Sequence, residues 1–198
     1  MTLSDQALLA HDPESRALPG DIAIWLFILT ELVVFGLLFV GLEVGWRNAP
    51  ETFAQGARTL HVAAGFANTL VLITGSFFVA SAVRSIRQGC IRACVLLLLG
   101  GMATGALFAL IKIAEYQALI DAGYRLGTSI FYSFYFLATG FHLLHVLIAM
   151  LVLLIVAVRC LFGAYDADSP TGIETAASFW HMVDLVWIVL FPLLYILP

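Results

Sequence analysis

Charged side chains are scarce in this sequence of 198 residues. They make up 11% of it, whereas a soluble domain usually carries about a quarter. Hydrophobic residues make up 62% and the mean hydropathy is +1.03. This composition excludes an ordinary soluble globular protein.

Basic residues and cysteines are scarcer still. Nine Lys and Arg residues stand against thirteen Asp and Glu residues, which gives a formal net charge of −4. The basic residues are scattered singly, without the positive stripe that a phosphate backbone requires, so nucleic acid is not an expected partner. Cys90, Cys94 and Cys160 are too few, and too apolar in their surroundings, for a disulfide framework or a thiolate metal site.

Long apolar runs are what the sequence has instead. A helix needs about 20 apolar residues to cross a bilayer, and five runs are long enough, so we predict an all-α integral membrane protein with a bundle of five transmembrane helices. The predicted spans are 22–46, 63–83, 93–119, 130–158 and 177–197. They form one membrane domain over residues 21–198, preceded by a short cytoplasmic arm at residues 1–20, which lacks the basic and apolar regions of a secretory signal.

The arginines outside these spans indicate an orientation. Five lie on the N-terminal side of the membrane and three on the other side. Because cytoplasmic loops carry an excess of Lys and Arg, the N-terminus is predicted to be cytoplasmic and the C-terminus periplasmic. The first set is Arg16, Arg84, Arg87, Arg92 and Arg159, and the second is Arg47, Arg58 and Arg125.

Eight ionisable side chains fall within the predicted spans. Each costs roughly 2.5 to 3.5 kcal/mol at the centre of a membrane helix, so each is expected to face another helix, water or a partner rather than lipid. Six of them form three pairs spaced i, i+3, which favours one polar side on each of three helices. The eight are Glu31, Glu43, Lys112, Glu115, His142, His145, His181 and Asp184.

Three interpretations of these groups remain open. In the first, Glu31 and the intramembrane histidines and aspartate form hydrogen bonds between helices, with a histidine as the natural partner of Glu31. In the second, they relay protons or hold lipid headgroups. In the third, His142 and His145 ligate a metal or haem, although thiolates are absent and only three histidines lie within the spans. Lys112 and Glu115 are expected to neutralise each other where the third span leaves the bilayer.

Small and aromatic residues carry a packing signal. Gly101 and Gly105 form a G-x-x-x-G pattern in the third span, which allows close approach of two helix backbones. Trp25, Trp46 and Trp180 lie near predicted span ends, where aromatic belts form.

The last third of the chain carries a specific combination of motifs. Residues 139–146 read TGFHLLHV, residues 172–174 read GIE and residues 180–187 read WHMVDLVW. In this order and spacing they resemble subunit III of the haem-copper oxidases. The segment around Glu31 is similar to the glutamate-bearing helix of that family, and the resemblance covers nearly the whole chain.

The resemblance implies a particular branch of the family. Longer members have two helices more, so the chain resembles the short five-helix form found in quinol oxidases and in a protein associated with bacterial nitric oxide reductase. The opening LPGDIAIW of residues 18–25 and the segment 180–192 favour the nitric-oxide-reductase-associated branch.

The resemblance also implies a function. Subunit III of this family carries neither haem nor copper and is docked, in the bacterial inner membrane, against a catalytic subunit that holds haem and copper or non-haem iron. It stabilises that subunit, holds phospholipid and supports proton uptake, and it has no catalytic, cofactor or metal residue of its own. By motif match, the polar network comprises Glu31, His142, His145, Glu174, His181 and Asp184, and the packing positions are Trp180 and Trp187.

Two other classes of function are left as alternatives. One is a membrane electron carrier or enzyme whose own haem or metal is bound by transmembrane histidines. The other is a free-standing proton or solute transporter, which the lack of internal repeats and of paired broken helices disfavours.

Overall fold

The computed structural model describes residues 22–167 and 169–197, so the arm predicted at residues 1–20 lies outside the described part. The described chain is helical and contains no strand. Five of its helices are long and apolar enough to cross a membrane, which confirms the predicted fold class of a multi-pass membrane protein. The helices are α2 (Ile22–Asn48), α3 (Pro50–Ala57), α4 (Val62–Arg87), α5 (Ile91–Asp121), α6 (Ile130–Leu161) and α7 (Thr171–Tyr195).

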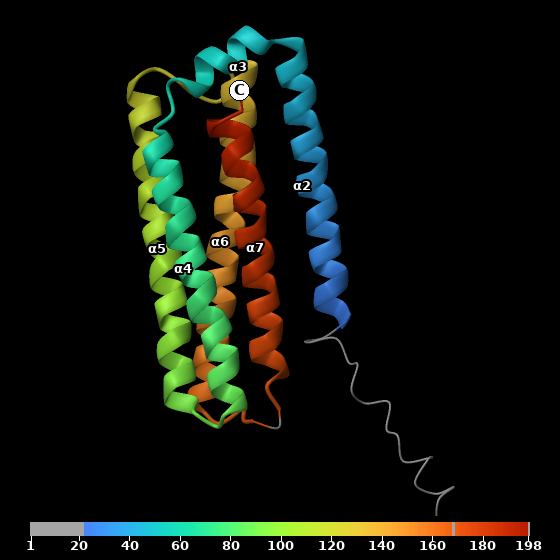
Figure 1. Cartoon of the computed structure of the whole chain (residues 1–198), viewed down its shortest axis with the longest axis vertical. Helices are drawn as coiled ribbons and strands as arrows, with labels where there is room; N and C mark the ends of the chain where they lie inside the picture. Colours follow the sequence, from blue (N-terminus) through green and yellow to red (C-terminus); the bar gives the residue numbers. More distant parts are fainter. Residues whose placement is uncertain (1–21, 168, 198) are drawn as a thin grey trace, which may run out of the picture.

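The long helices run alongside one another with alternating direction (Figure 1). α4 and α5 share the most extensive contact, and α6 and α7 complete a four-helix bundle with them. α2 stands at the side of this bundle, and among the long helices it packs mainly against α6 and α7. α3 lies across one end, where α7 also finishes, and we call this the α3 end of the bundle.

The short helix α3 was not expected from the hydropathy of the sequence, because it is too polar to count as a span. Pro50 starts it, a position where proline loses no helical hydrogen bond. Phe53 is fully buried and meets the ring of Phe131 of α6 edge to face, with the ring centroids 5.5 Å apart. Phe53 also lies 6.4 Å from the ring centroid of Phe134, so the short helix closes the α3 end with aromatic contacts to α6.

The start of the last span was placed too late. α7 begins at Thr171 rather than at residue 177, so Gly172 and Glu174 lie in its first turns and not in a link. The polar residues of this segment hid the helix from a search for apolar runs. A Cβ atom on Gly172 would collide with the ring of Tyr165, so only glycine lets the preceding link pack against this turn.

Close packing at the centre of the bundle depends on glycines from α4 and α5. Gly75 of α4 faces Thr104 and the indole of Trp180, and Gly105 of α5 faces Met150 and the same indole. Trp180 is 2% exposed, so it lies in the core and not in an aromatic belt as the sequence predicted. The close approach of α7 to α4, with the Trp180 indole reaching α5, thus requires the absence of side chains at these glycines.

We expect Gly75→Ala to lower the free energy of unfolding by about 1 to 3 kcal/mol, because the added methyl would overlap Thr104 Oγ1 and lie 2.8 Å from Trp180. Thermal or denaturant unfolding in detergent micelles measures this. Gly140→Ala is the matched control: its methyl meets nothing within 4 Å, and removing a helical glycine gains about 0.5 to 1 kcal/mol. Equal stability of the two variants would contradict this packing.

Candidate functional site

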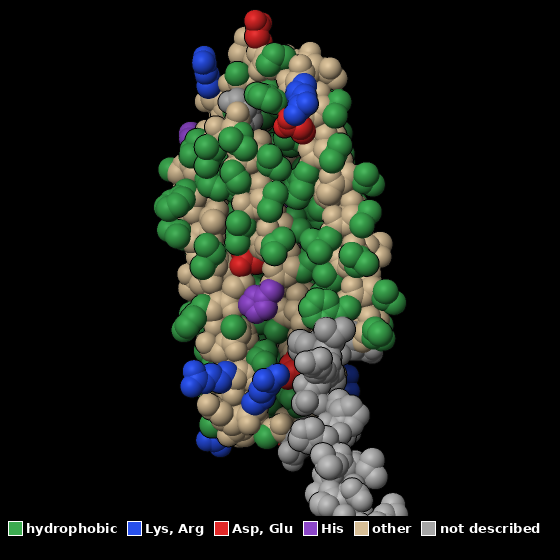
Figure 2. Space-filling view, turned by 45° about the vertical axis from the view of Figure 1, so that its right-hand side comes forward, with side chains coloured by type: hydrophobic (Ala, Val, Ile, Leu, Met, Phe, Trp, Pro, Cys, Tyr) green, Lys and Arg blue, Asp and Glu red, His purple; other side chains and the backbone are tan. Residues whose placement is uncertain are grey.

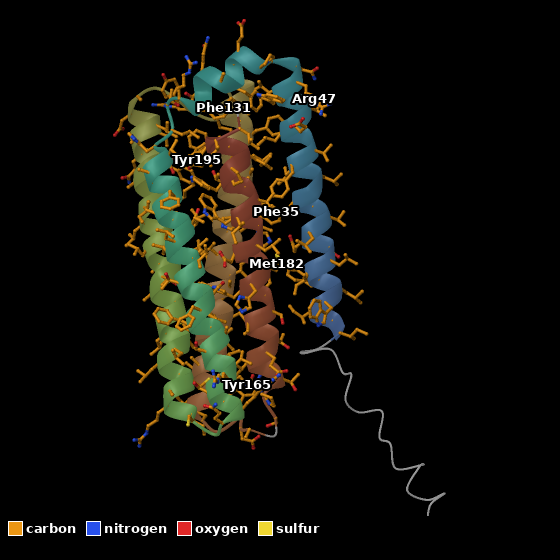
Figure 3. The ribbon with its side chains drawn as sticks, viewed as in Figure 1. Phe35, Arg47, Phe131, Tyr165, Met182 and Tyr195 are labelled. Atoms are coloured by element: carbon orange, nitrogen blue, oxygen red, sulfur yellow. The ribbon has the colours of Figure 1, made fainter. Side chains whose placement is uncertain are left out.

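Glu31 and His145 connect α2 to the bundle at membrane depth. His145 Nε2 lies 3.0 Å from Glu31 Oε2, and its Nδ1 lies 2.8 Å from the carbonyl oxygen of Phe141. A carbonyl oxygen only accepts, so Nδ1 carries a hydrogen and a single proton is shared between Nε2 and the carboxylate. Phe35 of α2, which lies between α2 and the bundle (Figure 3), packs 5.4 Å from the imidazole.

A second polar group joins α4 to α7. The hydroxyl of Ser76 donates to Asp184 Oδ2 at 2.6 Å, and His181 Nδ1 lies 3.2 Å from Ser76 Oγ. Asp184 is 7% exposed, and its other carboxylate oxygen is buried without a hydrogen-bond partner in the described part of the chain. This group is therefore incomplete within the chain.

Lys112 and Glu115 pair as expected, with Lys112 Nζ 2.8 Å from Glu115 Oε2. Lys112 is 0% exposed, so this ion pair lies inside the bundle rather than on the surface of α5. Its ammonium group also donates to the hydroxyls of Tyr135 at 3.0 Å and Tyr195 at 2.5 Å, and the Tyr195 hydroxyl donates to Glu115 at 2.9 Å. Figure 3 shows Tyr195 near the α3 end.

Aromatic rings surround the Lys112 ammonium group. It lies 4.7 Å from the ring centroid of Tyr135, 5.1 Å from that of Tyr195 and 5.2 Å from that of Trp187. Such cation–π contacts are strongest where the cation is desolvated. Sequence reasoning missed both tyrosines because each stands alone in an apolar run, and only the fold brings them to Lys112.

His142 does not form the hydrogen bond between helices that the sequence predicted. It is 0% exposed, and neither ring nitrogen has a hydrogen-bond partner among the described residues. Its ring stacks on Trp187 with centroids 5.2 Å apart and meets Phe108 at 5.4 Å. His142 thus faces α5 and α7 whereas His145 faces α2, so the two imidazoles are not arranged around a common metal ion.

The remaining charged groups lie at the ends of the helices. Glu174 accepts from Arg87 Nη2 at 2.6 Å and connects the start of α7 to the end of α4. Glu43 pairs with Arg47 along the exposed side of α2. Residues 22–167 and 169–197 hold no group of three or more His, Cys, Asp or Glu side chains that could bind a metal ion.

Grooves run beside α2. One of about 340 Å³ lies between α2 and α7 and is lined by Trp25, Leu32 and Met182 among others. A second of about 180 Å³ lies towards the α3 end and is lined by Leu42, Trp46 and other residues of α2, α3 and α7. Their linings are largely apolar, so their size and chemistry suit hydrocarbon chains.

We expect Lys112→Met to lower the free energy of unfolding by about 3 to 5 kcal/mol, because it leaves Glu115 buried without its cation. Unfolding in detergent measures this, and Lys112→Met combined with Glu115→Gln should recover much of the loss. Arg47→Met is the control, since its ion pair with Glu43 is exposed and such pairs contribute about 0 to 1 kcal/mol. A double variant no more stable than Lys112→Met would argue against the buried pair.

Comparisons with known proteins give matches over nearly the whole sequence of this chain. The family model for cytochrome c oxidase subunit III matches residues 19–198. A "Cytochrome c oxidase subunit 3" of Thermostichus vulcanus is 34% identical over 190 residues, which cover 95% of this chain and 90% of the relative. A "Probable cytochrome c oxidase subunit 3" of Rickettsia conorii is 30% identical over 96% of this chain and 72% of its own length.

A shorter match extends to animals. The "Cytochrome c oxidase subunit 3" of Papio hamadryas is 35% identical over 128 residues, which cover 65% of this chain and 48% of the relative, so the match spans about half of that protein. The match of the family model over nearly the whole chain, together with the two bacterial relatives, shows that this chain belongs to the cytochrome c oxidase subunit III family.

Proposed function

We propose that this chain is an accessory subunit of a haem-copper oxidase type of respiratory complex and holds no redox centre of its own. It docks against the haem-bearing catalytic subunit, stabilises it and supports its proton uptake during electron transport. The observation that carries this proposal is the contact between Glu31 and His145, which joins two helices at membrane depth. The chain is a member of the subunit III family, and its histidines face different helices.

The geometry of this tie suits proton supply. One proton is shared between Glu31 and His145, and the Glu31 side chain is 15% exposed against 5% for His145. With the shared proton on His145 Nε2, the carboxylate is the member that can accept a second proton from a neighbour outside the chain and release it again. His145 keeps the shared proton throughout, and its Nδ1 remains anchored to the carbonyl of Phe141.

Phospholipid is the second component of the proposal. The groove of about 180 Å³ towards the α3 end is lined mainly by apolar side chains, as acyl chains require. α2 contacts the bundle sparsely, so a lipid chain in this groove would add apolar contact that the protein alone does not make. Lipid and catalytic subunit together would hold α2 in place.

Several finer predictions accompany this function. We place the protein in the bacterial inner membrane, with the α3 end and the C-terminus on the periplasmic side and Arg84, Arg87 and Arg92 on the cytoplasmic side. Membership of the nitric-oxide-reductase-associated branch stays a prediction, and the relatives named above are oxidase subunits.

We expect Glu31→Ala to shorten the active lifetime of the complex under turnover while the haem spectrum of the catalytic subunit stays unchanged. Because an interhelical polar contact contributes about 0.6 kcal/mol, retention of the subunit after a detergent wash should fall about threefold. The measurements are oxidase or reductase activity against time and haem content per chain.

Thr30→Ala is the control for this experiment, because Thr30 is next to Glu31 on α2 but its hydroxyl donates to the carbonyl oxygen of Leu26 within the same helix. It should leave both the lifetime and the retention unchanged. If the purified chain alone showed a Soret band of stoichiometric strength, the chain would carry its own haem and the proposed function would be wrong.

A further inference from the structure

One polar group on the outer face of the bundle has no complete set of partners within the chain. The imidazole of His181 lines two grooves, the one of about 340 Å³ against α2 and one of about 230 Å³ against α4. Figure 2 shows histidine and acidic atoms at the surface in the middle of a face that is otherwise mostly hydrophobic. We call the surface formed by Ala80, Val83, Ser178, His181 and Leu185 the His181 face.

The hydrogen bonds of this group fix what His181 presents outwards. Ser76 has one hydroxyl hydrogen and gives it to Asp184, so Ser76 Oγ must accept from the Nδ1–H of His181. In the neutral imidazole, Nε2 is then an acceptor. Nε2 has no hydrogen bond in the described residues and, unlike the nitrogens of His142, it is not closed off by protein. The His181 face therefore offers a lone pair and needs a donor.

The depth of His181 decides which occupant can supply that donor. His181 is ten residues after the start of α7, about 15 Å along the helix. Glu174, seven residues before His181 and about 10 Å away along the helix, forms an ion pair with Arg87. A lipid headgroup at the level of this pair is therefore out of hydrogen-bond reach of His181, and acyl chains donate nothing. A second copy of this chain would bring the same lone pair against the first. A different protein helix with a donor side chain satisfies both conditions.

We propose that the His181 face is the docking surface for a transmembrane helix of the haem-bearing subunit, which donates a hydrogen bond to His181 Nε2. This rests on the proposed function. Ala80 and Ser178 are small and allow close approach of helix backbones. The ion pair of Arg87 and Glu174 lines the groove against α4 at the end of the bundle opposite α3. It offers charged partners to the same helix.

The first test is photo-cross-linking in native membranes. A benzophenone amino acid at Leu185, 54% exposed on the His181 face, should capture the haem-bearing subunit about tenfold more efficiently than one at Leu144 of α6 or Leu110 of α5, which are 50% and 66% exposed on other helices. Preferential capture from Leu144 or Leu110, capture of lipid alone, or a cross-linked dimer of this chain would each overturn the proposal.

The two proposals fail differently in this test. If the haem-bearing subunit copurifies with the chain but cross-links only from the other helices, the docking face is wrong and the accessory function stands. If no haem-bearing subunit copurifies with the unsubstituted chain, the accessory function is wrong, and the docking proposal falls with it.

The second test separates docking from folding. His181→Leu should lower the unfolding midpoint of the full chain in detergent no more than Ser76→Ala does, since both lose the hydrogen bond between these side chains. Only His181→Leu should reduce retention of the haem-bearing subunit, about threefold. His181→Gln should restore retention, because its Oε1 offers an acceptor near the place of Nε2. Full retention by His181→Leu, or a loss that only follows a lowered unfolding midpoint, would contradict a role in docking.

Discussion

The hydrocarbon core of a bilayer has no water to satisfy polar side chains, and this constraint orders the whole structure. Each polar group within the five long helices either forms its hydrogen bonds inside the chain or needs a hydrogen-bond partner from outside it. Lys112 satisfies all three of its N–H donors, on Glu115, Tyr135 and Tyr195. A group so complete holds helices together and offers nothing to a neighbour.

The other two polar groups form fewer of their possible hydrogen bonds inside the chain, and they lie at the edges of the bundle. Glu31 and His145 share one proton at the edge between α2 and α6, and their hydrogen bond depends on that proton. Ser76, His181 and Asp184 leave one accessible and one buried acceptor unmatched among the described residues, on the face between α4 and α7. The number of hydrogen bonds formed therefore distinguishes an internal structural cluster from the two groups to which we propose to assign proton supply and docking.

Hydropathy alone predicted the five spans, since the cost of exposing backbone in lipid allows little else. It missed α3, whose contribution is the single buried ring of Phe53, and it began α7 six residues late, because polar side chains at a membrane surface do not interrupt a helix. The i, i+3 rule paired Lys112 with Glu115 but could not supply Tyr195, 80 residues from Glu115. The same rule placed His142 and His145 on one side of their helix. Three residues make less than a full helical turn, and the remaining angle is enough to direct the two rings to different helices.

The position of α2 shows why an accessory role fits this architecture. Only 11% of its most apolar stretch is buried within the chain, against 61% for α7. The apolar surface of α2 therefore adds little to the folding of this chain alone. The directional contact from Glu31 to His145 fixes the position of α2 along the bundle more than its distance from the bundle. In the function that we propose, lipid and a neighbouring subunit supply the remaining apolar contact, so α2 is the helix whose packing the complex completes.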